Sequence, residues 1–179
     1  MARTRRWGAV ALLVVLTGCS GETDAPAPPP AAVHEHWAGC DTTSAFRDAW
    51  GPNQTPGVGG IPNAFIPVTA VLCFVGERPG KKAGAAPVAV DLERRATEIQ
   101  PLLTYLARPS RMSHDPELAC QAMAWSPPWL FLLDADGRWV HPQVPTDPCG
   151  FALDQFTERE LPWLSLPYTD TVVRVRAGG

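Results

Sequence analysis

The N-terminal end of the sequence decides the compartment in which this chain folds, and so the cysteine chemistry open to it. Three arginines lie within the first six residues, residues 7–16 are almost entirely apolar, and the small residues Thr17 and Gly18 follow. This layout is typical of a secretory signal peptide. An apolar run of about ten residues is only half of the roughly 20 that a membrane-spanning helix needs. We therefore assign residues 1–18 to a signal peptide and expect the rest to fold outside the cytoplasm.

Residues 16–19, Leu-Thr-Gly-Cys, resemble the lipobox of bacterial lipoproteins. The resemblance implies that a diacylglycerol is attached to the Cys19 thiol and that cleavage makes Cys19 the first residue. Two acyl chains hold a protein on a membrane where one chain is marginal. The alternative is that Cys19 is one more apolar residue of an ordinary signal peptide. The pair Arg5-Arg6 leaves the export route open between the general and the twin-arginine systems.

The charge of the mature chain narrows the range of partners. Three of the 15 basic residues and none of the 18 acidic residues lie in residues 1–18, so the mature chain has a net charge of −6. An acidic surface argues against binding to nucleic acid. It also argues against electrostatic docking on anionic lipid. Membrane attachment is therefore expected through acyl chains on Cys19 alone.

Four cysteines remain after Cys19, namely Cys40, Cys73, Cys120 and Cys149. In an exported chain an even number of cysteines indicates disulfides. Three pairings are open, and we favour Cys40–Cys73 and Cys120–Cys149 because each closes a moderate loop. A zinc site is the rival, but the chain lacks the close CxxC spacing of zinc ribbons.

The mature chain divides by composition into a tether and one domain. Residues 19–36 are rich in proline and alanine, and we expect them to form an extended tether without a core of its own. Residues 37–179 are long enough for one domain with a hydrophobic core and too short for two.

Residue patterning predicts an α+β domain, with helices packed on a small, mostly antiparallel sheet. Apolar residues at steps of three and four predict a helix over residues 91–106, with a kink or break at Gln100-Pro101. A hairpin is predicted over residues 129–141, with Gly137 supplying a positive φ. The other expected elements are helices at 40–50, from 115 onward and at 152–161, and strands at 66–76 and 171–176, the last at a sheet edge.

Few motifs suggest chemistry. His34 and His36 are candidate copper or zinc ligands, but two ligands do not close a site, and a solvated linker is the simpler interpretation. Asp134 and Asp136 resemble the start of a calcium loop, although a hairpin turn explains them as well. His114 and His141 are isolated. The chain has no P-loop, GxSxG or HExxH motif, and no cofactor is predicted. The six mature tryptophans are expected mainly in the core.

Two resemblances extend beyond the signal peptide. Cys73 in a strand, Cys120, the stretch "WLFLLDADGRWVHPQVPTDPCG" and the ending "VVRVR" resemble a loose group of uncharacterised actinobacterial lipoproteins. That resemblance implies localisation and disulfides, and no catalytic residues. The stretch "SPPWLFLLDADGRWV" is also similar to the strand–turn–strand that follows the cis-proline of thioredoxin-like proteins. Redox work of that type needs a CxxC pair, which this chain lacks.

Two functional hypotheses follow. The first is a non-enzymatic domain, lipid-anchored on the extracytoplasmic face of the cell membrane, which binds a protein or small ligand or serves the envelope. The second is a thiol-redox factor or another enzyme whose site forms only in three dimensions. Free thiols distinguish the two, because a redox factor needs a reducible, exposed pair.

Overall fold

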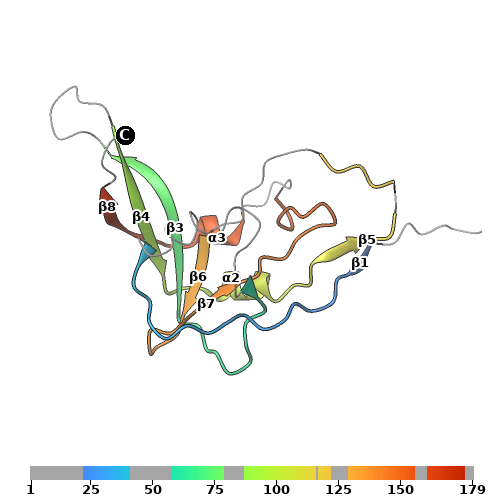
Figure 1. The fold of residues 1–179 in the computed structure, drawn as a ribbon, viewed down its shortest axis with the longest axis horizontal. Coiled ribbons are helices and arrows are strands. Elements are labelled where there is room, and N and C mark those ends of the chain that lie inside the picture. Colours follow the sequence, from blue (N-terminus) through green and yellow to red (C-terminus); the bar gives the residue numbers. More distant parts are fainter. Residues whose placement is uncertain are drawn as a thin grey trace, which may run out of the picture.

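The computed structural model describes residues 22–40, 58–78, 87–115, 117–121, 129–155 and 161–175. Its centre is a six-stranded sheet in the order β2-β7-β6-β3-β4-β8 (Figure 1). All neighbouring pairs are antiparallel except β2 with β7, which is parallel. The strands are β2 (Val58–Gly59), β3 (Thr69–Arg78), β4 (Val88–Ala96), β6 (Trp129–Leu133), β7 (Trp139–Pro142) and β8 (Thr169–Val175).

A separate two-stranded ribbon stands at the other end of the molecule from β3, β4 and β8 (Figure 1). It pairs β1 (Glu22–Asp24) with β5 (Arg111–Ser113) in antiparallel register. Two short helices, α2 (Gln100–Leu106) and α3 (Pro162–Ser165), complete the described elements. Among the described residues, no helix is both long and apolar enough to cross a membrane.

The expected α+β class is wrong, because the described part of the chain is mostly β. The decisive segment is residues 91–106, which we expected to be one kinked helix. It instead continues β4 through Ala96 and forms a helix only from Gln100. β4 is hydrogen-bonded on both sides, to β3 and to β8, and these long-range bonds override the local spacing of apolar residues. Pro101 does not kink a helix but lies in its first turn, where a missing N–H costs nothing.

The helix predicted over residues 152–161 is also wrong in its described part. Ala152 forms a bridge with Thr146, and residues 153–155 form a turn in which Asp154 has a φ of 67°. Residues 156–160 lie outside the described part. Pro162 begins α3 instead of ending a helix. Where a helix was expected from residue 115 onward, the amide of Leu118 closes a turn on the carbonyl of Asp115. The helix expected over residues 40–50 lies outside the described residues beyond Cys40. The thioredoxin-like alternative also fails, since only two short helices accompany a mainly antiparallel sheet in the described part.

The strand predictions are confirmed. The predicted hairpin is β6 and β7, and Gly137 in its turn has a φ of 78°. The apolar run at residues 66–76 contributes β3, and the last strand, β8, lies at the edge of the sheet. Each of these segments carries a local signal, either β-branched residues or a turn glycine, that agrees with its surroundings.

The centre of the sheet, at β6, is buried on both faces. Leu130 and Leu132 of β6 join the cluster that includes Leu102 of α2 and Trp163 of α3. The alternate residues Phe131 and Leu133 join a second cluster on the other face with Trp139, Trp37 and the Cys40–Cys73 disulfide. The helices cover one face, and the N-terminal segment helps to cover the other.

The N-terminal segment differs from the free tether expected for residues 19–36. From Glu22 onward it is extended, but it lies on the domain. Ala31 is buried in the helix-side cluster, and Trp37 packs into the cluster on the opposite face. The segment therefore passes around the β2–β7 edge of the sheet. The folded body includes residues that we had placed before its predicted start at Trp37.

Candidate functional site

The segment that we expected to be a tether forms one wall of the candidate site. The amide of Ala25 donates to the carbonyl of the residue before β5 over 2.7 Å. At the other end, Gly60 donates its amide to Pro29 and accepts the amide of Ala31, each over 2.8 Å. Residues 25–31, called the strap below, are thus fixed to the domain at both ends.

A pocket of about 380 Å³ lies between the strap and the C-terminal end of α2. Small-molecule sites in proteins span about 300–1,000 Å³, so this volume suits a small ligand. The walls come from four parts of the chain: the strap, α2 with the loop after it, β2, and the end of β7 with the loop after it. Ala27, Pro28, Leu103, Leu106, Ala107 and Pro142 are among its lining residues.

The chemistry of the pocket is mainly apolar. Four prolines line it, and a proline has no N–H to donate. The other apolar lining residues are Ile61, Leu103, Leu106 and three alanines. The polar side chains at the pocket are Arg108, Ser110 and Gln143. Such a surface favours burial of hydrocarbon over a ligand that needs several hydrogen-bond donors.

Glycine at position 59 allows the strap to lie close to β2. A β-carbon on Gly59 would overlap the carbonyl oxygen of Pro29 and come within 2.7 Å of the amide nitrogen of Ala31. At Gly60, by contrast, a β-carbon would make ordinary contacts of 3.6 Å with Pro28. Gly59 and Gly60 therefore form the surface on which the strap docks.

An ion pair stands at one rim of the pocket. Nη1 of Arg108 donates to Oδ2 of Asp154 over 2.6 Å, and the guanidinium lies 5.3 Å from the centre of the Tyr105 ring. The Tyr105 hydroxyl donates to the carbonyl of Leu153 over 2.7 Å. Burial raises the pKa of Tyr105 to about 12, with Arg108 opposing and Asp154 adding to that rise. Tyr105 therefore stays protonated, and the rim keeps an Arg–Asp pair of zero net charge.

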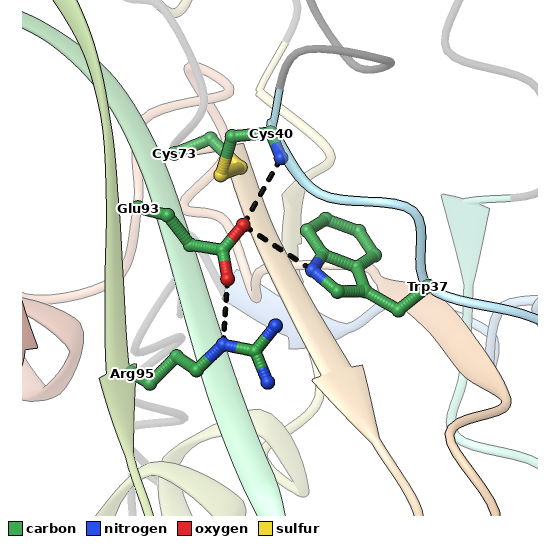
Figure 2. Close-up of a disulfide and its surroundings, with 5 residues drawn as sticks. All are labelled: Trp37, Cys40, Cys73, Glu93 and Arg95. Atoms are coloured by element: carbon green, nitrogen blue, oxygen red, sulfur yellow. Dashed lines mark hydrogen bonds and ion pairs between the residues drawn. A yellow bond between two sulfur atoms is a disulfide. The ribbon is translucent and has the colours of Figure 1, made fainter. Parts of the chain in front are cut away.

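A second cluster surrounds the Cys40–Cys73 disulfide (Figure 2). Glu93, whose side chain is only 6% exposed, points from β4 toward the disulfide and the N-terminal segment. Its Oε2 accepts the Trp37 indole N–H over 3.3 Å and the Cys40 amide over 3.1 Å. Its Oε1 accepts Nε of Arg95 over 2.6 Å. One buried carboxylate thus ties the N-terminal segment to the sheet.

Both disulfides form in the favoured pairing, Cys40–Cys73 and Cys120–Cys149. They differ in environment. Cys40 and Cys73 are 3% and 7% exposed, whereas Cys120 is exposed. The first disulfide is thus shielded from solvent thiols, and it links the N-terminal segment covalently to β3. Cys19 lies outside the described residues.

Both candidate metal-binding histidines lie beside β7, where His34 makes backbone and ring contacts and His36 makes a backbone contact. His34 exchanges backbone hydrogen bonds of 2.9 Å with Trp139, and its ring stacks on that indole at 4.0 Å. The carbonyl of His36 accepts the indole N–H of Trp139 over 3.1 Å. Burial lowers the pKa of His34. No group of three metal-ligating side chains exists among the described residues, and the pair serves to attach its segment to β7.

Asp134 organises the hairpin turn. Its Oδ1 accepts the amides of Asp136 and Arg138 over 3.0 and 2.9 Å, and its Oδ2 accepts Nε of Arg138 over 2.7 Å. Burial opposes ionisation of Asp134, but the hydrogen bonds from Arg138 outweigh it, so the pKa of this carboxyl lies below its ordinary value. The hairpin interpretation of the acidic pair therefore agrees with the structure.

The remaining candidates also fall into structural roles. His141 lies 4.9 Å from Phe131, and burial, with repulsion from His34, lowers its pKa to about 4. His114 shares a hydrogen bond of 3.0 Å with Thr23 across the ribbon. Trp139 and Trp163 are buried, and Trp37 and Trp129 are half-buried, whereas Trp50 and Trp125 lie outside the described residues.

The pocket was not foreseen from the sequence, because its walls come from segments up to about 120 positions apart. The adjacent Gly59-Gly60 and the prolines before and after them were the only local sign that two backbones meet there. A scan against protein-family models and searches of curated proteins and of solved structures found no match to the chain. Function is therefore inferred from the chemistry and geometry of the site itself.

Proposed function

We propose that this chain is a lipid-anchored, extracytoplasmic lipoprotein whose domain binds a small apolar ligand without catalysing a reaction. The observation that carries the proposal is the pocket of about 380 Å³ under the strap, lined by prolines and aliphatic side chains. Export is supported by the signal-peptide layout and by two disulfides, which persist in oxidising compartments. Attachment through acyl chains on Cys19 follows from the lipobox pattern at residues 16–19.

Ligand binding is tested on the mature chain, residues 19–179, carrying Cys19→Ser so that detergent is not needed. Radiolabelled laurate, a single-chain apolar probe, is titrated by equilibrium dialysis. We expect saturable binding at one site. Ala107→Phe places a ring in the pocket from an exposed position on its wall and should weaken binding at least about tenfold, or ~1.4 kcal/mol.

The matched control is Ala135→Phe, which adds the same side chain at an exposed alanine in the β6–β7 turn that does not line the pocket. It should leave the affinity unchanged. Non-saturable binding, or equal affinities of the two phenylalanine variants, would contradict the pocket as a ligand site.

The anchor is tested separately in cells. Globomycin, which blocks lipoprotein signal peptidase, should cause the full precursor to accumulate, and mass spectrometry should find acyl chains on Cys19 of the mature form. Cys19→Ser is the control and should be insensitive to the inhibitor. Unchanged processing with an unmodified sulfhydryl on Cys19 would remove the anchor from the proposal and leave the pocket in place.

A further inference from the structure

The pocket begins very close to the proposed anchor. Cys19 lies three positions before Glu22, where β1 starts, and Ala25, the first lining residue, directly follows β1. Six peptide steps separate Cys19 from Ala25, and an extended chain spans at most about 3.6 Å per residue. An acylated Cys19 therefore keeps this wall of the pocket within roughly 22 Å of the bilayer surface.

The order of the elements places the pocket between the ribbon and the main sheet. Figure 1 shows the β1–β5 ribbon at one end of the molecule, with α2 between it and the sheet. The pocket is lined by residues that directly follow β1 and by Pro109 and Ser110, which directly precede β5. The pocket thus lies next to the ribbon, which is the part of the domain that the anchor holds near the membrane.

Charge does not hold this end on the membrane. Glu22 and Arg111 pair across the ribbon at 3.1 Å, and Asp24 adds an exposed carboxylate. An acidic surface gains nothing from anionic headgroups. The length of chain between Cys19 and β1 therefore sets how close the pocket stays to the lipid.

We propose that the ligand is a single-chain amphiphile that enters the pocket directly from the bilayer, with its hydrocarbon chain against Leu103 and Leu106. This inference depends on the proposed function. Each methylene favours departure from water, so such molecules reside mainly in the membrane. The Arg108–Asp154 pair at the rim is polar but has no net charge, which suits either a fatty acid or a lysophospholipid headgroup.

The test uses the processed, acylated protein in phosphatidylcholine vesicles that contain a fatty acid with a photoactivatable diazirine in its chain. Cross-linked residues are located by mass spectrometry. We expect labels on Leu103, Leu106 or Ala107, and we expect Ala107→Phe to reduce them at least about tenfold relative to Ala135→Phe.

The source of the ligand is tested by lengthening the anchor. A flexible Gly/Ser insertion of about 20 residues between Gly21 and Glu22 lengthens the connection from about 3 to about 23 steps. Effective concentration falls as the −3/2 power of that length, so labelling should fall roughly twentyfold. The same insertion placed after Gly179 is the matched control and should leave labelling unchanged.

The outcomes separate the two proposals. If laurate binds the Cys19→Ser chain but the N-terminal insertion leaves labelling unchanged, the ligand arrives through water, and the bilayer route is overturned while the pocket stands. Labels confined to residues outside the pocket also overturn the inference. If laurate fails to bind at all, the proposed function falls as well.

Discussion

Gly59 lies so close to Pro29 that any β-carbon at position 59 would overlap the Pro29 carbonyl oxygen. This contact attaches the strap to the main sheet at β2, and the strap forms one wall of the apolar pocket. The close approach is possible because glycine has no β-carbon, so a substitution by alanine, which adds a single methyl group, tests it.

Gly59→Ala should reduce the free energy of unfolding by about 1–3 kcal/mol, because backbone atoms must move apart to admit the new carbon. Urea denaturation followed by tryptophan fluorescence measures the change. Gly60→Ala is the matched control. Its β-carbon has room at 3.6 Å, so it should be neutral or slightly stabilising. Equal losses in the two variants would contradict the close approach at position 59.

Glu93→Gln should destabilise the domain by about 1–3 kcal/mol, because the carboxylate that accepts three donors becomes a neutral amide with only one acceptor atom. Asp170→Asn is the control. It removes the charge of an ion pair with Arg94 whose aspartate is 51% exposed, and surface pairs contribute at most about 1 kcal/mol. Chemical denaturation of both variants checks the difference, and a larger effect at Asp170 would refute the role of Glu93.

The two disulfides should be reduced in a fixed order. Under native conditions at low dithiothreitol concentration, Cys120 and Cys149 should be alkylated first, because Cys120 is exposed while Cys40 and Cys73 are buried. Peptide mapping after alkylation identifies the modified cysteines. In unreduced, denatured protein, no free thiol is expected at these four positions. Initial modification of Cys40 or Cys73 would contradict the shielding.

Stability should fall as the pH drops from about 6.5 to about 4. In the folded state burial lowers the pKa of His141 to about 4 from its ordinary 6.5, so the unfolded chain binds more protons in this window. The stabilisation from neutral His141 is complete above pH 6.5 and is lost progressively toward pH 4, by about 3 kcal/mol in total.

Urea denaturation at several pH values measures this slope. His141→Gln should flatten it, and His114→Gln, at an exposed position on the ribbon, should leave it in place. A slope that is the same in wild type and His141→Gln would place its origin in other groups.

The predictions that succeeded depended on local signals. β6 and β7 are joined by a turn whose Gly137 takes a positive φ, and both strands are rich in branched and aromatic residues. The disulfide pairing was favoured from loop length alone, and it is the pairing present. The hairpin depends on residues close in sequence, and the disulfide pairing is one of only three that four cysteines allow.

The failures share a different cause. The spacing of Leu92, Ala96 and Ile99 suits a helix, but β4 gains hydrogen bonds from both β3 and β8. Nothing in the sequence of residues 88–96 indicates that β3 and β8 will lie on either side of this segment and pair with it. The strap presents the same difficulty, since its prolines and alanines offer too few apolar atoms to fold alone. Its position depends on contacts with Ser110 at one end and with Gly59 and Gly60 at the other.

By itself, the sequence was enough to predict the hairpin and the pairing of the four cysteines, both of which the structure contains, and it supplies the export signal and the anchor at Cys19 as predictions. Only the tertiary structure decided that residues 88–96 form a strand, that the N-terminal segment packs on the domain, and that a pocket lies beneath it. The physical reason is the distance in sequence over which the deciding interactions act. A turn glycine acts on its immediate neighbours, and four cysteines allow only three pairings, so both can be interpreted from sequence. Strand pairing and backbone docking depend on partners that only the folded chain brings together.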